Sequence, residues 1–233
     1  MKNIIKRLFD IAGWEIRRKP NYNTDQFAAQ RNVIQNEKPL IFDIGANIGQ
    51  TAVKYRNYFP DAIIHSFEPV PELYRILSSK AKKSWNIYAY PLALGDFVGK
   101  AKFYVSEIFT NQPSASSSLL APKEHLACAP HVSFKQEIEV NVTTIDAWAA
   151  DHGVDAIDFM WLDMQGYELN ALMAAPRILK TVSVILTEVE FVEAYEGQYL
   201  YADVKEFLEQ QGFTLIATNF LPWYGDAIFA RLQ

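Results

Sequence analysis

The chain has 233 residues, of which 50% are hydrophobic and 21% are charged, a length and composition typical of one folded globular domain. A formal net charge of -5 gives no general attraction for nucleic acid, and the single cysteine, Cys128, excludes an intrachain disulfide and a thiolate zinc cage. We therefore expect a soluble cytoplasmic protein without a nucleic-acid partner. The sequence carries no signature of its oligomeric state.

Residues 1–36 are expected to form a helical extension to this domain. Lysine and arginine outnumber acidic residues in positions 1–20, where Ile4, Leu8 and Ile11 fall at helical spacing. This pattern predicts an amphipathic helix with a basic face. Such a helix either packs on the domain edge or makes a peripheral contact with anionic lipid at the inner membrane surface. No run of the chain approaches the ~18 apolar residues that cross a bilayer.

Strands and helices alternate along the rest of the chain. In chain order, we expect a strand over 39–43, a helix over 49–58, a strand over 62–67, a helix around 73–77, strands over 86–94 and 100–105, a polar region over 106–137, a strand over 138–142, a helix over 144–151, a strand over 157–163, a helix around 169–173, a strand over 182–189, a helix around 204–208, and strands over 213–217 and 227–232. Strands that alternate with crossover helices form a mostly parallel sheet with helices on both faces. We therefore expect a single α/β domain over 1–233.

The polar region 106–137 interrupts this alternation and contains a serine-rich run at 113–118. Unstructured segments of this length inside a domain are usually functional or disordered. We expect a lid or a substrate-binding insertion. His125 and His131 flank a proline in it, and either imidazole is a candidate proton acceptor.

The segment 43–49, Asp-Ile-Gly-Ala-Asn-Ile-Gly, joins the first expected strand of the sheet to a helix. Gly45 and Gly49 permit a tight turn and a close ligand approach, and helix N-terminal amides there suit a carboxylate or a phosphate. A dinucleotide fingerprint needs glycine at positions 47 and 50, where this chain has Asn47 and Gln50. A pyrophosphate would be crowded, so the turn favours S-adenosylmethionine (SAM), which carries no phosphate.

Four acidic residues lie at or beside the ends of expected strands: Asp43, Glu68, Asp163 and Glu188. Ligands of parallel α/β sheets bind at the carboxyl ends of the strands, so we expect these side chains to share one rim. Glu68 follows Asp43 at the spacing where a carboxylate accepts hydrogen bonds from both ribose hydroxyls of a bound nucleoside. The sequence therefore predicts a nucleoside-cofactor site at this rim.

These motifs resemble the FkbM family of SAM-dependent methyltransferases. The matching segments are 42–49, 65–71, 93–96, 143–146, 162–168 and 186–189. The resemblance implies a Rossmann-like class I methyltransferase sheet with an antiparallel final strand, and O-methylation of a hydroxyl on a sugar, a glycan or a polyketide. It also implies a SAM-binding set of Asp43, Gly45, Ala46, Asn47, Gly49, Glu68, Pro69 and Ala93.

Three residues are candidates for the catalytic base. Asp163 is the first, because it ends a buried strand beside the cofactor rim; Glu188 is the second and His125 the third. The structural alternatives are that Asp163 only bonds amides of the following turn and that Glu188 pairs with a helix end. Asp163, Gln165 and Glu188 could hold Mg²⁺, although their spacing does not demand it. The family commonly has glutamate where this chain has Gln165, which removes a charge.

Other functions remain open at this point. Tyr195, Tyr199, Tyr201, Trp223 and Tyr224 are candidates for a sugar platform, and equally for core packing. A nicotinamide-dependent sugar oxidoreductase would share the sheet and the ribose carboxylate, but Asn47 argues against it. A non-catalytic SAM-binding protein would keep the same fold without turnover. The acceptor is left as a free sugar, a polyketide or a lipid-linked glycan.

Overall fold

The computed structural model describes residues 33–34, 36–108, 112–113 and 115–231. The expected N-terminal helix and its lipid contact lie outside the described residues. Within the described ranges, no helix is both long enough and apolar enough to cross a membrane.

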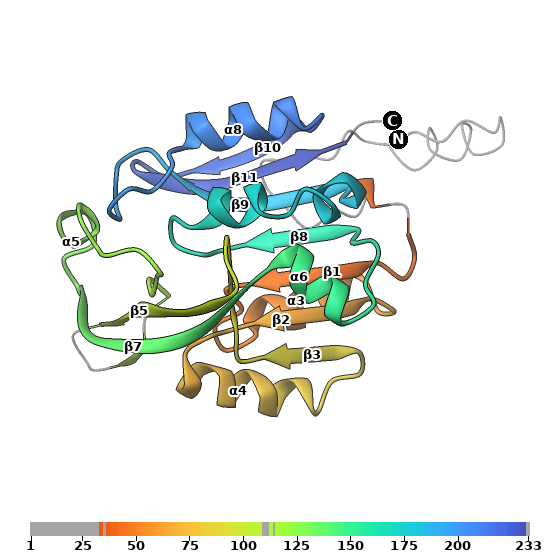
Figure 1. Cartoon of the computed structure of the whole chain (residues 1–233), viewed down its shortest axis with the longest axis horizontal. Helices are drawn as coiled ribbons and strands as arrows, with labels where there is room; N and C mark the ends of the chain where they lie inside the picture. Colours follow the sequence, from red (N-terminus) through yellow and green to blue (C-terminus); the bar gives the residue numbers. More distant parts are fainter. Residues whose placement is uncertain (1–32, 35, 109–111, 114, 232–233) are drawn as a thin grey trace, which may run out of the picture.

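A seven-stranded sheet forms the centre of the described chain (Figure 1). Its strands are β1 (Leu40–Ile44), β2 (Ile63–Phe67), β3 (Ile87–Tyr90), β8 (Phe159–Leu162), β9 (Val184–Glu190), β10 (Thr214–Phe220) and β11 (Tyr224–Ala230), in the order β10-β11-β9-β8-β1-β2-β3. Strands β9, β8, β1, β2 and β3 are parallel, whereas β11 runs antiparallel to both β9 and β10. This confirms the expected mostly parallel sheet with an antiparallel final strand.

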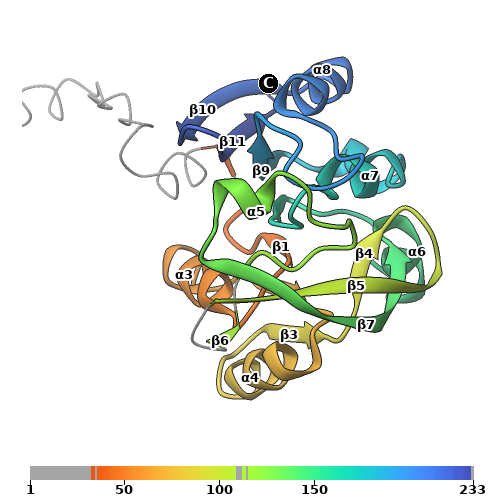
Figure 2. The same cartoon turned by 90° about the vertical axis from the view of Figure 1, so that its left-hand side faces the viewer.

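Helices cover both faces of this sheet. They are α3 (Gln50–Tyr58), α4 (Pro71–Ala81), α6 (Ile145–Asp151), α7 (Glu168–Met173) and α8 (Tyr201–Gln210), with a 3₁₀ turn η1 (Ile178–Thr181). Figure 2 shows α3 on one side of the sheet and α6 and α7 on the other. Strand β1 contributes side chains to the core on both sides of the sheet: Ile41 packs with Tyr55 of α3, and Phe42 packs with Trp148 of α6.

Not every apolar residue of these helices is buried. Helix α4 buries Leu73, Leu77 and Ala81, whereas its Ile76 is 44% exposed. Helix α7 buries Leu169 and Leu172, whereas Met173 at its end is 42% exposed.

A second, four-stranded sheet is built from β4 (Ala93–Gly95), β5 (Gly99–Ile108), β6 (Gln112–Pro113) and β7 (Val132–Thr144), in the order β4-β7-β5-β6. The expected single strand 86–94 is therefore wrong: β3 and β4 belong to different sheets. Pro91 lies between them and has no N–H for a continuous ladder.

Strands β5 and β7 reach further into the polar region 106–137 than expected. The ladder pairs Ile108 with Val132, so both ends of that region are strand, and the short helix α5 (His125–Cys128) lies between them. The second sheet and α5 stand at the end of the main sheet toward which β1 and β8 point (Figure 1), and they face the viewer in Figure 2. Contacts of Leu73 with an apolar cluster that includes Phe103 and Val142 fasten this second sheet over the carboxyl ends of the main strands.

Candidate active site

Acidic side chains gather at the carboxyl edge of the main sheet because the strand register aligns them. The last residue of β1 pairs with the last residues of β2 and β8, and the last residue of β8 pairs with Thr187 in β9. The next residues along these strands are therefore level with one another. They are Glu68, Asp163 and Glu188, while Asp43 lies one residue before the end of β1.

The turn between β1 and α3 is made of residues in the left-handed region. Gly45, Asn47 and Gly49 have φ angles of 82°, 51° and 81°, a region that glycine and asparagine adopt most readily. A Cβ atom on Gly45 would lie 1.8 Å from the carbonyl oxygen of Asp163. The neighbouring strand end, and not only a ligand, therefore requires glycine at position 45.

The backbone amides of residues 45–49 have acceptors inside the protein. The acceptors are the Phe67 carbonyl for Gly45 and Ala46, the Glu68 carboxylate for Asn47, the Asn47 side chain for Ile48, and the Ala46 carbonyl for Gly49. The amides of the turn itself are therefore engaged within the protein. Buried amides need a partner in the folded chain itself, and here each has one.

Glu68 stands directly after β2 and is 5% exposed. Its Oε1 accepts a hydrogen bond from the Val70 amide at 2.7 Å, and its Oε2 accepts one from the Asn47 amide at 2.9 Å. Burial raises the pKa of Glu68 to about 7, and these two amides act in the opposite direction. Each carboxylate oxygen keeps a second lone pair, so Glu68 can accept a further hydrogen bond from a ligand while the amides hold it in place.

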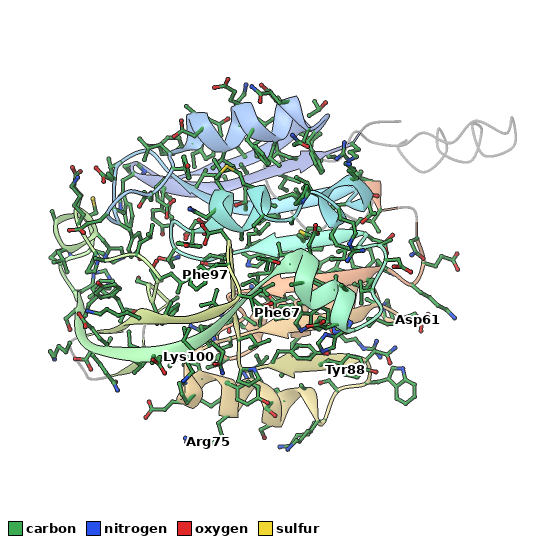
Figure 3. The ribbon with its side chains drawn as sticks, in the orientation of Figure 1. Asp61, Phe67, Arg75, Tyr88, Phe97 and Lys100 are labelled. Atoms are coloured by element: carbon green, nitrogen blue, oxygen red, sulfur yellow. The ribbon has the colours of Figure 1, made fainter. Side chains whose placement is uncertain are left out.

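A cavity, here called the first cavity, opens at the ends of β1, β2 and β8. Five of the residues predicted to bind a cofactor line it: Gly45, Asn47, Glu68, Pro69 and Ala93. The rest of the wall comprises Ile44, Phe67, Leu73, Leu92, Leu94, Phe103, Ala115, Ser117, Leu119, Asp163, Met164 and Tyr167. Figure 3 labels Phe67, the residue that ends β2. The wall is therefore mostly apolar and carries two carboxylates.

Three other predicted cofactor residues, Asp43, Ala46 and Gly49, are not among the described residues that line this cavity. Asp43 is fully buried, and it accepts a hydrogen bond from the Ser66 hydroxyl at 3.1 Å. Burial and the nearby charge of Asp163 together raise the pKa of Asp43 to about 7, although the hydrogen bond from Ser66 acts in the opposite direction.

Gln165 joins the two principal candidates for the base. Its amide nitrogen Nε2 donates to Asp163 Oδ1 at 2.9 Å and also to Glu188 Oε2. Its carbonyl oxygen Oε1 lies 2.8 Å from the Tyr195 hydroxyl, and its backbone oxygen accepts from the Ser118 hydroxyl at 2.7 Å. Both amide protons and the amide oxygen are thus engaged. The residue that departs from the family pattern is therefore the one that connects the acidic residues here.

Burial raises the pKa of both Asp163 and Glu188. The pKa of Asp163 rises to about 6, since hydrogen bonds from the side chains of Gln165 and Glu188 limit the increase. The pKa of Glu188 rises well above its ordinary value, because the charges of Asp163 and Glu190 add to burial. When two carboxyl groups interact in this way, the one with the lower pKa ionises first. With a pKa of about 6, Asp163 is therefore the member of the pair that is ionised at neutral pH.

Glu168 accepts hydrogen bonds from amides of the turn after β8, the structural role that the sequence analysis considered for Asp163. The Met164 amide donates to Glu168 Oε1 at 2.6 Å, and the amides of Gly166 and Glu168 also lower the pKa of this carboxyl. Burial nevertheless raises that pKa to about 7. The sequence analysis missed Glu168, although its place at the first turn of α7 is a favourable one for a carboxylate.

His125 opens α5 and is almost fully buried, with 1% exposed. Its ring packs against Phe134, Tyr195 and Trp223, with centroid distances of 5.3, 5.3 and 5.7 Å. Its Nδ1 atom has no hydrogen-bond partner among the described residues, and burial lowers its pKa. His125 is therefore a neutral imidazole at pH 7. It does not line the first cavity, and His131 is exposed.

The aromatic residues proposed for a sugar platform divide into two groups. Trp223 and Tyr224 line a second cavity together with Glu188, while Tyr195 is fully buried behind it. Tyr201 packs instead in an aromatic cluster on α8, with Phe191 and Phe220. Tyr199 is 38% exposed and lines neither cavity.

Tyr167 is a further residue of the first cavity that sequence reasoning missed. Its hydroxyl donates to Asp96 Oδ1 at 2.7 Å, which links the start of α7 to the turn between β4 and β5. Burial and the Asp96 carboxylate raise the pKa of this phenol. Both residues stand in segments quoted for the family resemblance, but nothing in their spacing shows that they meet.

Comparison with known proteins identifies a family for the described fold. Residues 43–215 match the family model of the methyltransferase FkbM domain. The 2-O-methyltransferase NoeI of Sinorhizobium fredii is 27% identical over 202 residues, which cover 86% of this chain and 82% of that protein. The 31-O-demethyl-FK506 methyltransferase FkbM of Streptomyces tacrolimicus is 25% identical over 232 residues, covering 90% of this chain and 84% of that protein.

A solved structure has the same fold. The crystal structure of a methyltransferase FkbM from Methylobacillus flagellatus superimposes with a TM-score of 0.55 at 13% sequence identity. The match covers 83% of this chain and 44% of that one, so this chain spans less than half of the larger protein. At this identity the likeness is one of fold.

Proposed function

Since the chain belongs to the FkbM methyltransferase family and is a SAM-dependent methyltransferase, we propose that it transfers the methyl group of SAM to a hydroxyl of a sugar or glycan. The observation that carries this proposal is the hydrogen-bonded group of Asp163, Gln165 and Glu188, in which Asp163 lines the first cavity. Two relatives are named as methyltransferases acting at an oxygen position, which supports a hydroxyl acceptor.

We place SAM in the first cavity, whose residues suit such a ligand. Glu68 would accept hydrogen bonds from the ribose hydroxyls, and Pro69 and Ala93 would lie beside the adenine. Gly45 and Asn47 would line the cavity wall beside the remaining part of SAM. Asp43, Ala46 and Gly49 would hold this turn in place from behind the wall. Bound there, SAM would supply a methyl group on a positively charged sulfur.

Asp163 would act as the base in this reaction. It lines the first cavity and is the ionised member of its pair with Glu188, so it can take the proton of the acceptor hydroxyl as the new carbon–oxygen bond forms. Gln165 fixes the Asp163 carboxylate by donating to Oδ1. Glu188, with its raised pKa, would hold a proton and orient the acceptor. We assign His125 to the acceptor side, because its ring does not reach the first cavity.

We propose that this transfer does not use Mg²⁺ at Asp163 and Glu188. Magnesium binds oxygen ligands, whereas the atom that faces both carboxylates is the donor nitrogen of Gln165. Rotating that amide would turn its oxygen toward the carboxylates, as a cation would require, but it would give up both hydrogen bonds that the nitrogen now donates. In the structure, the Gln165 amide therefore stands where a cation would have to bind. Full activity in excess chelator supports this proposal, and loss of activity that added Mg²⁺ restores contradicts it.

The segment that follows residue 114 would cover the active site. It would belong to the same single domain as the rest of the chain. Ser118 donates to the Gln165 backbone, and Tyr195 lies 2.9 Å from the Ser116 carbonyl. These contacts hold the insertion against the cavity, where it would exclude water from the reacting groups. This is the role we propose for the insertion 106–137.

Calorimetry with S-adenosylhomocysteine and NAD tests the function. We expect micromolar binding of S-adenosylhomocysteine and none of NAD, because Asn47 stands where a pyrophosphate needs glycine. The reverse result would favour a nicotinamide-dependent oxidoreductase. Binding without methylation of any acceptor would favour a non-catalytic SAM-binding protein.

The variant Asp163→Asn tests the base. The amide keeps the size of the side chain and removes its basicity, so SAM binding should persist while single-turnover methyl transfer falls by ~10²-fold or more. A folded Asp163→Asn protein with full single-turnover activity would exclude this role and leave Glu188 and His125 as the next residues to test. Thermal midpoint and cofactor affinity of the same variant reveal any loss that is only structural.

A further inference from the structure

A second cavity lies beside the first one. Its lining comes from α5, the start of β7, the end of β9 and the start of β11, and it comprises Ala115, Ser116, His125, Ala129, His131, Val132, Gln165, Glu188, Glu190, Trp223 and Tyr224. Ala115 lines both cavities, and Gln165 joins Asp163 of the first to Glu188 of the second. The two cavities thus meet at the acidic residues.

Three residues of the second cavity offer hydrogen-bond acceptors. Glu188 and Glu190 present carboxyl oxygens, and the buried His125 ring contributes an Nδ1 atom that has no partner among the described residues. A buried polar atom without a partner costs free energy unless a ligand or water supplies one. Hydroxyl groups, which donate, are the natural partners for this set.

The electrostatic character of this cavity disfavours anions. No lysine or arginine occurs among the described residues that line it. Lys123, beside α5, forms an ion pair with Glu193 on the surface. The charges of Asp163, Glu168 and Asp226 add to that of Glu190 in raising the pKa of Glu188. A phosphate or carboxylate group brought here would face this cluster with no cation to offset the repulsion.

An aromatic wall completes the second cavity. Trp223 and Tyr224 lie with ring centroids 4.4 Å apart, and Trp223 also contacts the edge of His125. Aromatic faces bury the apolar C–H face of a sugar ring, while the hydroxyls at the ring edge reach acceptors around it. Carboxyl groups on one side and an aromatic face on another are therefore suited to an uncharged sugar.

We infer that the second cavity is the acceptor site and that it takes an uncharged sugar, such as the unphosphorylated end residue of a glycan, and rejects sugar phosphates and nucleoside diphosphate sugars. This rests on the proposed function, because the acceptor hydroxyl must enter from the second cavity to reach Asp163. Trp223 supplies the stacking face, and His125, Glu188 and Glu190 accept hydrogen bonds from the sugar hydroxyls.

The test measures binding and turnover with matched sugars. A panel of hexoses and deoxyhexoses is prepared in three forms: methyl glycoside, 1-phosphate and nucleoside diphosphate. Binding to the complex with S-adenosylhomocysteine is followed by saturation-transfer NMR, and methylation from labelled SAM by mass spectrometry. We expect binding and methylation of one or more methyl glycosides, with at least about tenfold weaker binding for their phosphorylated forms.

Two tryptophan variants locate the site. Trp223→Ala should abolish glycoside binding while keeping the affinity for S-adenosylhomocysteine, whereas Trp85→Ala, at a position 76% exposed beyond α4, should change neither. If the Trp223→Ala protein misfolds and loses its affinity for S-adenosylhomocysteine, the same measurements are made on Trp223→Leu. Equal glycoside binding in the Trp223 variant, stronger binding of phosphorylated forms, or no glycoside binding overturns the acceptor-site inference. Failure of the wild type to bind S-adenosylhomocysteine would instead overturn the proposed function.

Discussion

Replacing Gln165 with glutamate perturbs the acidic cluster at its centre. The variant Gln165→Glu keeps the shape of the side chain but removes the amide nitrogen that donates to both Asp163 and Glu188. A protonated carboxyl group at position 165 could donate only one of those two bonds. At low pH these carboxyl groups are uncharged, and a hydrogen bond between uncharged groups contributes ~0.5–1.5 kcal/mol, so the free energy of unfolding should fall by about that amount there.

The loss should increase with pH. Burial and the neighbouring charges that raise the pKa of Glu188 would also raise that of a carboxyl at position 165. A carboxyl whose pKa is higher in the folded than in the unfolded state contributes stability below the unfolded value, and this contribution is lost as pH rises toward the folded value. The deficit of Gln165→Glu should therefore grow above pH ~4.5 by up to about 1.4 kcal/mol per pH unit.

Urea denaturation at pH 5, 6 and 7 measures this deficit. The matched control is Gln136→Glu, which makes the same chemical change at an exposed position of β7. We expect the control to differ little from the wild type at every pH, and the deficit of Gln165→Glu to be larger at pH 7 than at pH 5. A deficit that is constant with pH, or equal to that of the control, would refute the arrangement of Gln165 between two carboxyl groups.

Three other measurements follow from the site geometry. Glu68→Ala should weaken the binding of S-adenosylhomocysteine by ~1–3 kcal/mol in calorimetry, and an unchanged affinity would remove Glu68 from the ribose role. Gly45→Ala should lower the thermal midpoint far more than Gly197→Ala. Both glycines have a positive φ, but only at Gly45 would the added Cβ atom clash with a backbone oxygen, so equal losses would contradict this packing. The ligand-free wild type should have a higher free energy of unfolding at pH 5 than at pH 7.5. In the folded state Asp43 and Glu68 have pKa values of about 7 and lose their protons between these two pH values, whereas in the unfolded state they lose them below pH 5. Stability that rises between those two pH values would show that these carboxyl groups are not buried as described.

The identity of the main elements was available from local patterns. The apolar run before Asp43 predicts the strand β1, and the left-handed positions of the following turn coincide with Gly45, Asn47 and Gly49. Both signals depend on a few consecutive residues, since strand periodicity and turn conformation are properties of short segments. Local patterns did not predict that the expected strand 86–94 divides into two strands, because the pairing of each strand depends on how the sheets pack together.

The acidic rim itself could be predicted, because the ends of parallel strands meet at one edge whatever the details of packing. The sequence thus determined the fold class, the acidic rim and the glycine-containing turn between β1 and α3. Only the tertiary structure decided that Gln165 bridges Asp163 and Glu188, that His125 is buried, and that a second cavity lies beside the first. The groups involved come from β8, β9, α5 and β11, which are far apart in the chain. Their contacts depend on strand register and on the placement of the second sheet, and these are set by long-range packing that no local pattern records.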